Sequence, residues 1–399
     1  MKTNRIFLLA ALPLLLAACK NAAPDDSFPN EYGEIKDMSG EWDGVGAPGG
    51  SNSGGQGEDM AGLVTASEWN DLAHWDFWGN LMNNQELYGY TETWKFFTNH
   101  RVAVRVAQSG SPVCGAKVRL SDGSGAVWNA VTDNKGECSL WYSLYQRTSN
   151  TDDASLPLSI AIDGVAQPGT PVVTAWNSPE VLWNEYEAAP NSLQGVDIAF
   201  IVDATGSMTD EIDFLKADVL DIVNGIDQQA AVRTAALFYR DEDDEYVTRV
   251  SNFSESPAVT YSFVNEQYAD GGGDWPEAVH TAFEVSLQSL SWNAASRVKL
   301  AFWLLDAPPH EEPAVIASIQ QSVKTYASMG IRLIPVAASG IDKSTEILLR
   351  NFAVVTGGTY VFITDDSGIG GEHIEATVGE CEVEALNSLI VRLINEYTR

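Results

Sequence analysis

The sequence is poor in basic residues and in cysteine, and it has no long apolar segment outside its N-terminus. Its 399 residues include 23 Lys and Arg against 55 Asp and Glu, which gives a formal net charge of −32. Nucleic-acid phosphates and anionic lipid surfaces are bound by clustered Lys and Arg, so the charge argues against both as partners. Apolar residues make up 45% of the chain, which is ample for packed cores and excludes a wholly disordered protein.

The one membrane-directed segment is short. Lys2 and Arg5 flank the start of an apolar run over residues 6–18, which is too short to span a bilayer and is typical of an export signal. The run ends in Leu16-Ala17-Ala18-Cys19, which resembles a bacterial lipobox. The resemblance implies cleavage after residue 18, a lipid on the Cys19 thiol and a protein anchored in the bacterial cell envelope, at the outer membrane. An ordinary signal peptide with an incidental cysteine is the alternative.

Only three cysteines remain if Cys19 carries a lipid, so at most one disulfide forms within the chain. Cys114 and Cys138 are the closest in sequence, and both lie in segments that resemble strands. We therefore predict a disulfide between them and a buried thiol at Cys381. The absence of a Cys-x-x-Cys pair argues against a structural zinc site.

Composition divides the rest of the chain into three parts. Residues 19–60 are predicted to be a disordered tether, because seven of the 14 residues in 44–57 are glycine. Residues 61–190 begin with an aromatic cluster, which is either a carbohydrate-binding platform or packing material; we favour packing. Its members are Trp69, Trp75, Phe77, Trp78, Trp94, Phe96 and Phe97.

Short segments of alternating apolar and polar residues follow the aromatic cluster. They lie at residues 102–106, 116–120, 126–131, 138–142 and 158–162, with turn-forming residues between them. This spacing predicts a small all-β sandwich. Residues 115–120 and 132–136 resemble carboxypeptidase regulatory-like or Ig-like surface modules, which are generally structural or adhesive.

Residues 191–399 change to a strand–helix alternation. Residues 196–202 form a nearly continuous apolar run, as expected for a strand buried on both faces of a parallel sheet. Further strands are predicted at 234–239, 300–305, 331–336 and 360–363, with amphipathic helices between them. The pattern indicates a doubly wound, Rossmann-like α/β domain, in which ligands bind beyond the carboxyl ends of the strands.

Three loops of this domain carry oxygen ligands. Asp203, Thr205 and Ser207 follow the first strand, Asp306 follows the strand at 300–305, and Asp274 lies between them in Gly-Gly-Gly-Asp-Trp-Pro-Glu. Carboxylates and hydroxyls are the ligands of hard divalent cations. The three loops resemble those of the von Willebrand factor type A domain, in which they form a metal-ion-dependent adhesion site (MIDAS).

The resemblance implies five metal ligands here. They are Asp203, Thr205 and Ser207 from the first loop, Asp274 from the second and Asp306 from the third. The family usually has a threonine in the second loop, and a third carboxylate there is expected to tighten metal binding while weakening the pull on a partner's acidic group. The cation would be Mg²⁺ or Ca²⁺, or alternatively Mn²⁺.

The sequence thus predicts a lipid-anchored adhesion protein that binds a protein or matrix ligand through the metal, with no enzyme activity. Because of the acidic surface, the partner is expected to be neutral or basic overall. A glycan-binding protein that uses the aromatic cluster is one alternative. A metal-dependent hydrolase that uses His310 as a base is the other. The acidic run 241–245 is expected to be a solvated loop, with a second cation site for Ca²⁺ as the alternative.

Overall fold

The structure is a computed structural model of the chain, and it describes residues 64–147, 157–226, 231–273, 275–364 and 374–399. The predicted leader 1–18, the tether 19–60 and two predicted site residues, Cys19 and Asp274, lie outside the described residues. Within them, every helix is too short or too polar to cross a bilayer.

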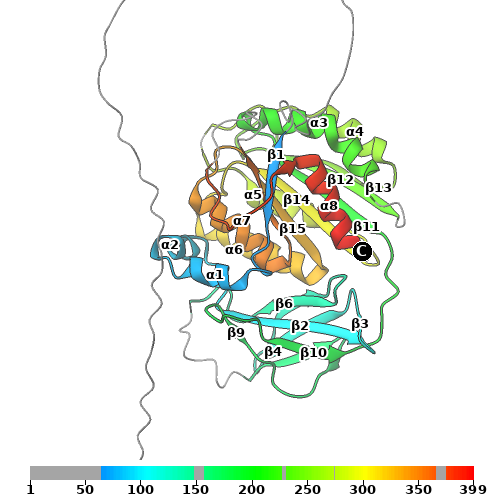
Figure 1. The fold of residues 1–399 in the computed structure, drawn as a ribbon. Coiled ribbons are helices and arrows are strands. Elements are labelled where there is room, and N and C mark those ends of the chain that lie inside the picture. The colour runs from blue at the N-terminus through cyan, green and yellow to red at the C-terminus, as the bar shows by residue number, and fades with distance from the viewer. Residues whose placement is uncertain (1–63, 148–156, 227–230, 274, 365–373) are drawn as a thin grey trace, which may run out of the picture. The chain divides into compact units, whose positions relative to one another are not determined.

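A large mixed sheet organises the C-terminal half, as Figure 1 shows. Five parallel strands form its centre: β12 (Val232–Tyr239), β11 (Val196–Asp203), β14 (Val298–Leu305), β15 (Ile331–Ala337) and β16 (Tyr360–Thr364). Three antiparallel strands complete its edges: β13 (Thr248–Ser254), β1 (Thr65–Trp69) and β17 (Glu384–Ala385). Every residue of β11 and β14 is buried, as their apolar sequences predict.

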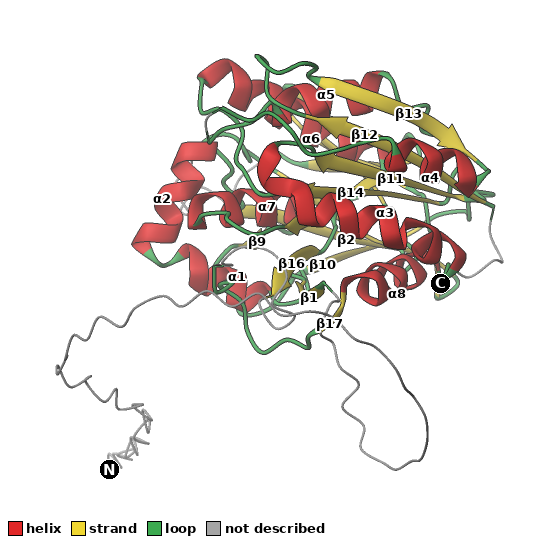
Figure 2. Cartoon of the chain, turned by 90° about the horizontal axis from the view of Figure 1, so that it is seen from above, coloured by secondary structure: helices red, strands yellow, loops and turns green. Residues whose placement is uncertain are grey.

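Helices cover both faces of this sheet. One face carries α3 (Thr209–Asn224), α4 (Pro257–Asn265) and α8 (Leu386–Thr398). The other carries α5 (Val279–Gln288), α6 (Pro313–Met329) and α7 (Lys343–Thr356). Alternate residues of β11 face the two layers: Phe200 packs on the side of α3 and Ile201 on the side of α5, α6 and α7. Figure 2 shows the sheet between them, which confirms the predicted Rossmann-like fold.

The predicted all-β region, which precedes the α/β domain in the chain, contains two sheets. In the first, β2 (His100–Gln108) pairs with β3 (Ser111–Pro112), β6 (Glu137–Trp141), β9 (Thr174–Ala175) and β10 (Trp183–Glu187). The second has the order β5 (Gly125–Val131), β4 (Lys117–Asp122), β7 (Ser159–Ile162) and β8 (Val165–Ala166). Apolar residues of both sheets, including Val104 and Leu120, share one core. The β2–β10 pair is parallel, so the sheets are not wholly antiparallel.

One segment crosses the boundary that the sequence predicts near residue 190. Strand β1 pairs with β16 of the large sheet, and the helices α1 (Trp75–Met82) and α2 (Gln85–Trp94) follow it. The indole of Trp94 donates to the Ser344 carbonyl at the start of α7, at 3.2 Å. Six of the seven clustered aromatics are buried and the seventh, Phe77, is half-buried. These side chains are therefore packing material, and the exposed platform that glycan binding requires is not formed.

The predicted disulfide is absent from this structure. Cys114 and Cys138 are both free thiols. The Cys114 sulfur lies 3.8 Å from the Arg297 carbonyl, whereas Cys138 is buried on β6 opposite Val104. The two cysteines thus contact different parts of the protein despite their nearness in sequence. Cys381 is exposed, which corrects the expectation of a buried thiol.

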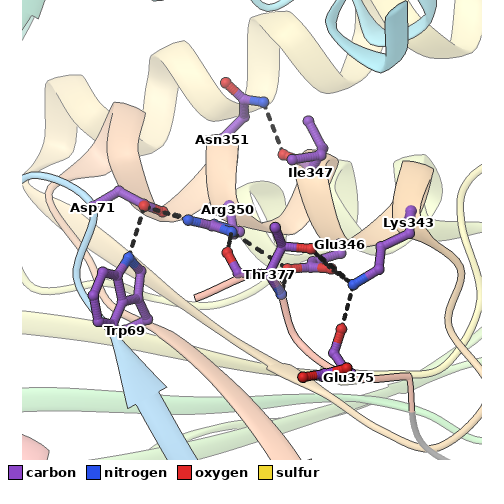
Figure 3. Close-up of polar contacts among 9 residues, drawn as sticks. All are labelled: Trp69, Asp71, Lys343, Glu346, Ile347, Arg350, Asn351, Glu375 and Thr377. Atoms are coloured by element: carbon purple, nitrogen blue, oxygen red, sulfur yellow. Dashed lines mark hydrogen bonds and ion pairs between the residues drawn. The ribbon is translucent and has the colours of Figure 1, made fainter. Parts of the chain in front are cut away.

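A buried charged cluster joins the segment after β1 to α7 and to residues 375–377, as Figure 3 shows. Arg350 has no exposed side-chain surface; its Nε donates to Asp71 Oδ2 at 2.9 Å, and another guanidinium nitrogen lies 3.3 Å from Glu346 Oε1. Glu346 also accepts from Lys343 Nζ at 2.7 Å and from the Thr377 amide at 2.7 Å. Ion pairs and hydrogen bonds of this cluster therefore hold together segments that are distant in the sequence.

Tight packing behind α7 gives a first testable prediction. A Cβ added to Gly358 would lie 1.8 Å from the Leu333 carbonyl oxygen on β15, which is backbone and cannot turn aside. We expect Gly358→Ala to lower the free energy of unfolding by about 1–3 kcal/mol, the usual cost of overpacking. Gly89→Ala is the control, because a Cβ there meets nothing within 4 Å. Equal urea midpoints for the two variants would contradict this packing.

Candidate metal centre

Two buried carboxylates lie at neighbouring strand ends. Asp203 is the last residue of β11 and is fully buried, and Asp306 directly follows β14 and is 5% exposed. Because β11 and β14 are adjacent and parallel, their carboxyl ends share one edge of the sheet. The structure therefore brings together two of the predicted ligands from positions about a hundred residues apart.

The loop after β11 supplies hydroxyl groups beside these carboxylates. The Thr205 amide and hydroxyl donate to Asp203 Oδ1 at 2.9 and 2.7 Å, which holds the loop against the strand end. A hydroxyl that donates its proton this way keeps its oxygen lone pairs for another partner. Gly206 and Ser207 follow in a short 3₁₀ helix, and a hydrogen bond from Ser207 offsets part of the rise that burial causes in the pKa of Asp306.

Burial and like charge act together on the two aspartates. Burial, and next the charge of Asp306, raise the pKa of Asp203 to about 7. Burial also raises the pKa of Asp306. Asp203 Oδ2 and Asp306 Oδ1 are buried and make no hydrogen bond of ordinary geometry among the described residues, although the nearby Tyr239 hydroxyl lowers the pKa of Asp203 in part. Such orphaned carboxylate oxygens cost free energy, and a cation would satisfy both at once.

A third carboxylate, Glu277, completes this group and was not among the predicted ligands. It is 3% exposed, and its Oε2 also lacks a partner within the described part of the chain. Burial and the charge of Asp203 raise the pKa of Glu277 to about 9, with further contributions from Asp241, Asp244 and Asp306. The only sequence clue is its place in the same glycine-rich motif as Asp274.

The second loop is held over the first by its backbone. The Gly206 amide donates to the Gly271 carbonyl at 3.2 Å, and the Glu277 amide donates to the Pro308 carbonyl at 2.9 Å. Gly272 has a positive φ of 75°, and a Cβ there would lie 3.0 Å from Thr205 Cβ. A glycine is therefore required for this close approach, which places Glu277 beside the strand ends.

The acidic run 241–245 is partly built into this edge, which corrects the expectation of a simple solvated loop. Asp244 Oδ2 accepts from the Asp241 and Gly272 amides, both at 3.1 Å. His310 Nε2 lies 3.0 Å from Asp241 Oδ1, and Asp241 is only 9% exposed. This contact joins the acidic run to the loop after β14.

The residues present fit a hard divalent cation. Two carboxylates with unpartnered oxygens, two hydroxyls and the nearby Glu277 form an all-oxygen set of the kind that Mg²⁺ and Ca²⁺ prefer. Among residues whose placement the structure gives, no three His, Cys, Asp or Glu side chains form a ready metal-binding group. Two of the five predicted ligands are hydroxyls, and a third predicted carboxylate, Asp274, lies outside the described residues.

The raised pKa values give a pH prediction for the cation-free protein. The pKa of Asp203 is higher in the folded than in the unfolded chain, so proton binding by Asp203 stabilises the fold. This stabilisation is complete below about pH 4 and is lost as the pH rises through about 7. In chelator, we expect the free energy of unfolding to fall by about 1–3 kcal/mol between pH 5 and pH 8. Adding Mg²⁺ should abolish most of this fall. Urea denaturation at both pH values measures it, and a pH-independent stability in chelator would contradict the placement of these carboxylates.

Comparisons with known proteins agree with this geometry. Residues 197–365 match the family model for the von Willebrand factor A domain. An ariadne-like RING finger protein of Acanthamoeba polyphaga mimivirus is 31% identical over 131 residues, which cover 33% of this chain and 13% of that protein. The alpha-protein kinase vwkA of Dictyostelium discoideum is 33% identical over 119 residues, 29% of this chain and 19% of the kinase. The chain spans less than a fifth of the length of either relative.

Solved structures of similar proteins are more distant in sequence. A von Willebrand factor type A protein from Catenulispora acidiphila is 14% identical, with 73% of this chain and 51% of that chain covered and a TM-score of 0.37. The proximal thread matrix protein 1 of the mussel byssus, whose structure has a zinc-occupied MIDAS motif, is also 14% identical. That match covers 52% of this chain and 46% of the mussel chain, with a TM-score of 0.37. The family match over residues 197–365 and the mixed sheet with helices on both faces together give this part of the chain the fold of a von Willebrand factor A domain.

Proposed function

We propose that the edge formed by Asp203 and Asp306 binds a divalent cation and, through it, an acidic group of a protein or matrix partner. The observation that carries this proposal is the pair of buried carboxylates whose oxygens lack partners, beside the hydroxyls of Thr205 and Ser207. A bound cation supplies a Lewis-acidic position that a partner's carboxylate completes. Metal-dependent protein binding is also the general role of von Willebrand factor A domains.

Each ligand has a defined part in this proposal. Asp203 and Asp306 supply the negative charge, and Thr205 and Ser207 supply neutral oxygens. Asp274 remains a proposed ligand from the sequence. Glu277 supports the expectation of an acidic second loop, because its buried carboxylate faces the charges of both aspartates. The extra charge should favour tight cation binding and reduce the pull on the partner's acidic group.

The proposed role is binding and not catalysis. His310, which a hydrolase would use as its base, has its Nε2 against Asp241. The partner is proposed to be neutral or basic apart from its one acidic contact, because the net charge of −32 repels acidic proteins. An anchor at Cys19 would hold the protein in the bacterial envelope, at the outer membrane.

Capture of envelope proteins tests this function. Immobilised wild type and Asp203→Ala would each be incubated with envelope extract, with and without chelator. We expect a partner on the wild type in the presence of Mg²⁺ and its loss in the other three samples, because each of those lacks the cation or a ligand to it. Recovery of the same proteins in all four samples would refute metal-dependent adhesion.

A further inference from the structure

A cavity of about 370 Å³ lies away from the metal edge, between the all-β region and the α/β domain. Its walls come from β2, β6 and β10 on one side and from β15, the α7–β16 turn and the end of α8 on the other. The volume falls in the range of small-molecule sites, about 300–1,000 Å³. The walls include Arg101, Arg105, Arg332, Trp183 and Tyr397.

Arg101 is a buried cation that hydrogen-bonds to neutral groups and packs against two indole rings. It is 2% exposed, and its Nε donates to Ser139 Oγ at 3.0 Å while another nitrogen donates to the Leu72 carbonyl at 3.3 Å. Its guanidinium carbon lies 4.8 Å from the centre of the Trp75 ring and 5.9 Å from that of Trp183. Within the described residues, no carboxylate lies within ion-pair distance of it. Burial lowers the pKa of Arg101 to about 9.

Arg332, on the opposite wall, is also a buried cation that hydrogen-bonds to neutral groups. It is 7% exposed, and its guanidinium donates to the carbonyls of Thr356 at 3.0 Å and Val131 at 3.3 Å. It likewise has no ion pair within the part of the chain that the structure covers. Burying a cation is costly unless an anion compensates it, so two such arginines at one cavity need an explanation.

The acidic residues of the cavity have partners other than Arg101 and Arg332. Glu137 accepts from Arg105 at 2.7 Å, and Glu396 pairs with Arg392 at 3.1 Å. Asp133 Oδ1 accepts the amides of Lys135 and Glu137 at 2.9 and 2.8 Å. Four cationic and three anionic side chains therefore line the cavity, a formal charge of +1 in a chain whose net charge is −32. One negative charge would neutralise it.

We propose that this cavity binds a small organic monocarboxylate, whose oxygens pair with the guanidiniums of Arg101 and Arg332. Guanidinium groups recognise carboxylates through paired, charge-assisted hydrogen bonds. A phosphate dianion would exceed the formal charge of the walls and would be more costly to desolvate at so buried a position. Trp183, whose ring lies 4.2 Å from the Arg105 guanidinium carbon, would bound the apolar part of the ligand.

Thermal unfolding with acetate and glucuronate tests the proposal, with chloride at equal ionic strength as the reference. The measurement is made on the Asp203→Asn protein, so that carboxylates binding at the metal edge do not contribute. We expect both carboxylates to raise Tm above the chloride value, while glucose has no effect and phosphate has a smaller one. Failure of both carboxylates, or a phosphate effect as large as theirs, would overturn the proposal.

Substitutions in the same background locate the effect. Arg101→Met should remove the rise in Tm. Arg105→Met serves if that variant does not fold, because 39% of the Arg105 side chain is exposed. It takes one positive charge from the walls and should weaken acetate binding several-fold. The control is Arg119→Met, on the exposed face of β4 and outside the cavity. An undiminished Tm rise in Arg105→Met, or an equal loss in Arg119→Met, would place the anion elsewhere.

Discussion

Replacing Arg350 by methionine should destabilise the protein by about 3–5 kcal/mol, the cost of removing one partner from a buried ion pair. The substitution keeps a long side chain but leaves Asp71 buried without its cation and leaves the buried Glu346 with Lys343 as its remaining ion-pair partner. The Asp71 and Glu346 carboxylates and the Thr377 carbonyl would also lose the hydrogen bonds from Arg350 that now hold the segment after β1 and residue 377 against α7. Urea denaturation followed by tryptophan fluorescence measures the loss.

Two variants show whether the loss comes from uncompensated charge. Arg147→Met breaks an ion pair with Glu92 in which both side chains are well exposed, so it should cost no more than about 1 kcal/mol. The triple variant Asp71→Asn, Glu346→Gln, Arg350→Met removes all three charges and should recover part of the stability that Arg350→Met loses. If Arg350→Met were no more destabilising than Arg147→Met, the buried cluster of Figure 3 would contribute less to the free energy of unfolding than we expect.

Asp306→Asn should have opposite effects on the protein with and without a cation. In chelator at pH 8, the substitution removes the repulsion between Asp306 and Asp203, which contributes to the raised pKa of Asp203, so stability should rise by about 1–2 kcal/mol. In Mg²⁺ at a hundred times its Kd, the wild type should gain about 2.7 kcal/mol by mass action. The variant should gain little, because one of the charged ligands is gone.

The two conditions together distinguish a metal site from a structural acid. The control is Asp243→Asn, because Asp243 is an exposed acid of the neighbouring loop and should respond to Mg²⁺ as the wild type does. A variant Asp306→Asn that is destabilised in chelator would show that the carboxylate is satisfied within the protein. A full Mg²⁺ response in that variant would show that the cation binds elsewhere.

The sequence was sufficient to predict the features that depend on local patterns. The run 196–202 is apolar except for Asp197 because β11 is buried on both faces, and the order of strands and helices predicted the parallel sheet. Asp203 and Asp306 could be predicted to meet because the ends of adjacent parallel strands share an edge. The aromatic cluster was correctly interpreted as packing, although its partner, α7, was not foreseen.

Features that depend on contacts between distant segments were missed. Nothing in the local pattern of β1 indicates that it pairs with β16 almost three hundred residues away, so the domain boundary near residue 190 did not anticipate this strand. Arg350 and Asp71 are separated by 279 residues, and each alone resembles an ordinary surface charge. Glu277 is in a motif that was noticed, but its burial depends on the loop after β14. The disulfide was inferred from nearness in sequence, which does not measure distance in the fold.

Calorimetric titration of the chelator-treated protein with Mg²⁺ or Mn²⁺ is the most direct test of the metal edge. We predict one cation per chain for the wild type, with proton release near pH 7 because the raised pKa of Asp203 leaves that carboxyl partly protonated. Asp203→Asn should show no binding at that site, and Asp243→Asn should match the wild type. Absence of binding to the wild type, or binding that Asp203→Asn leaves undiminished, would contradict the account.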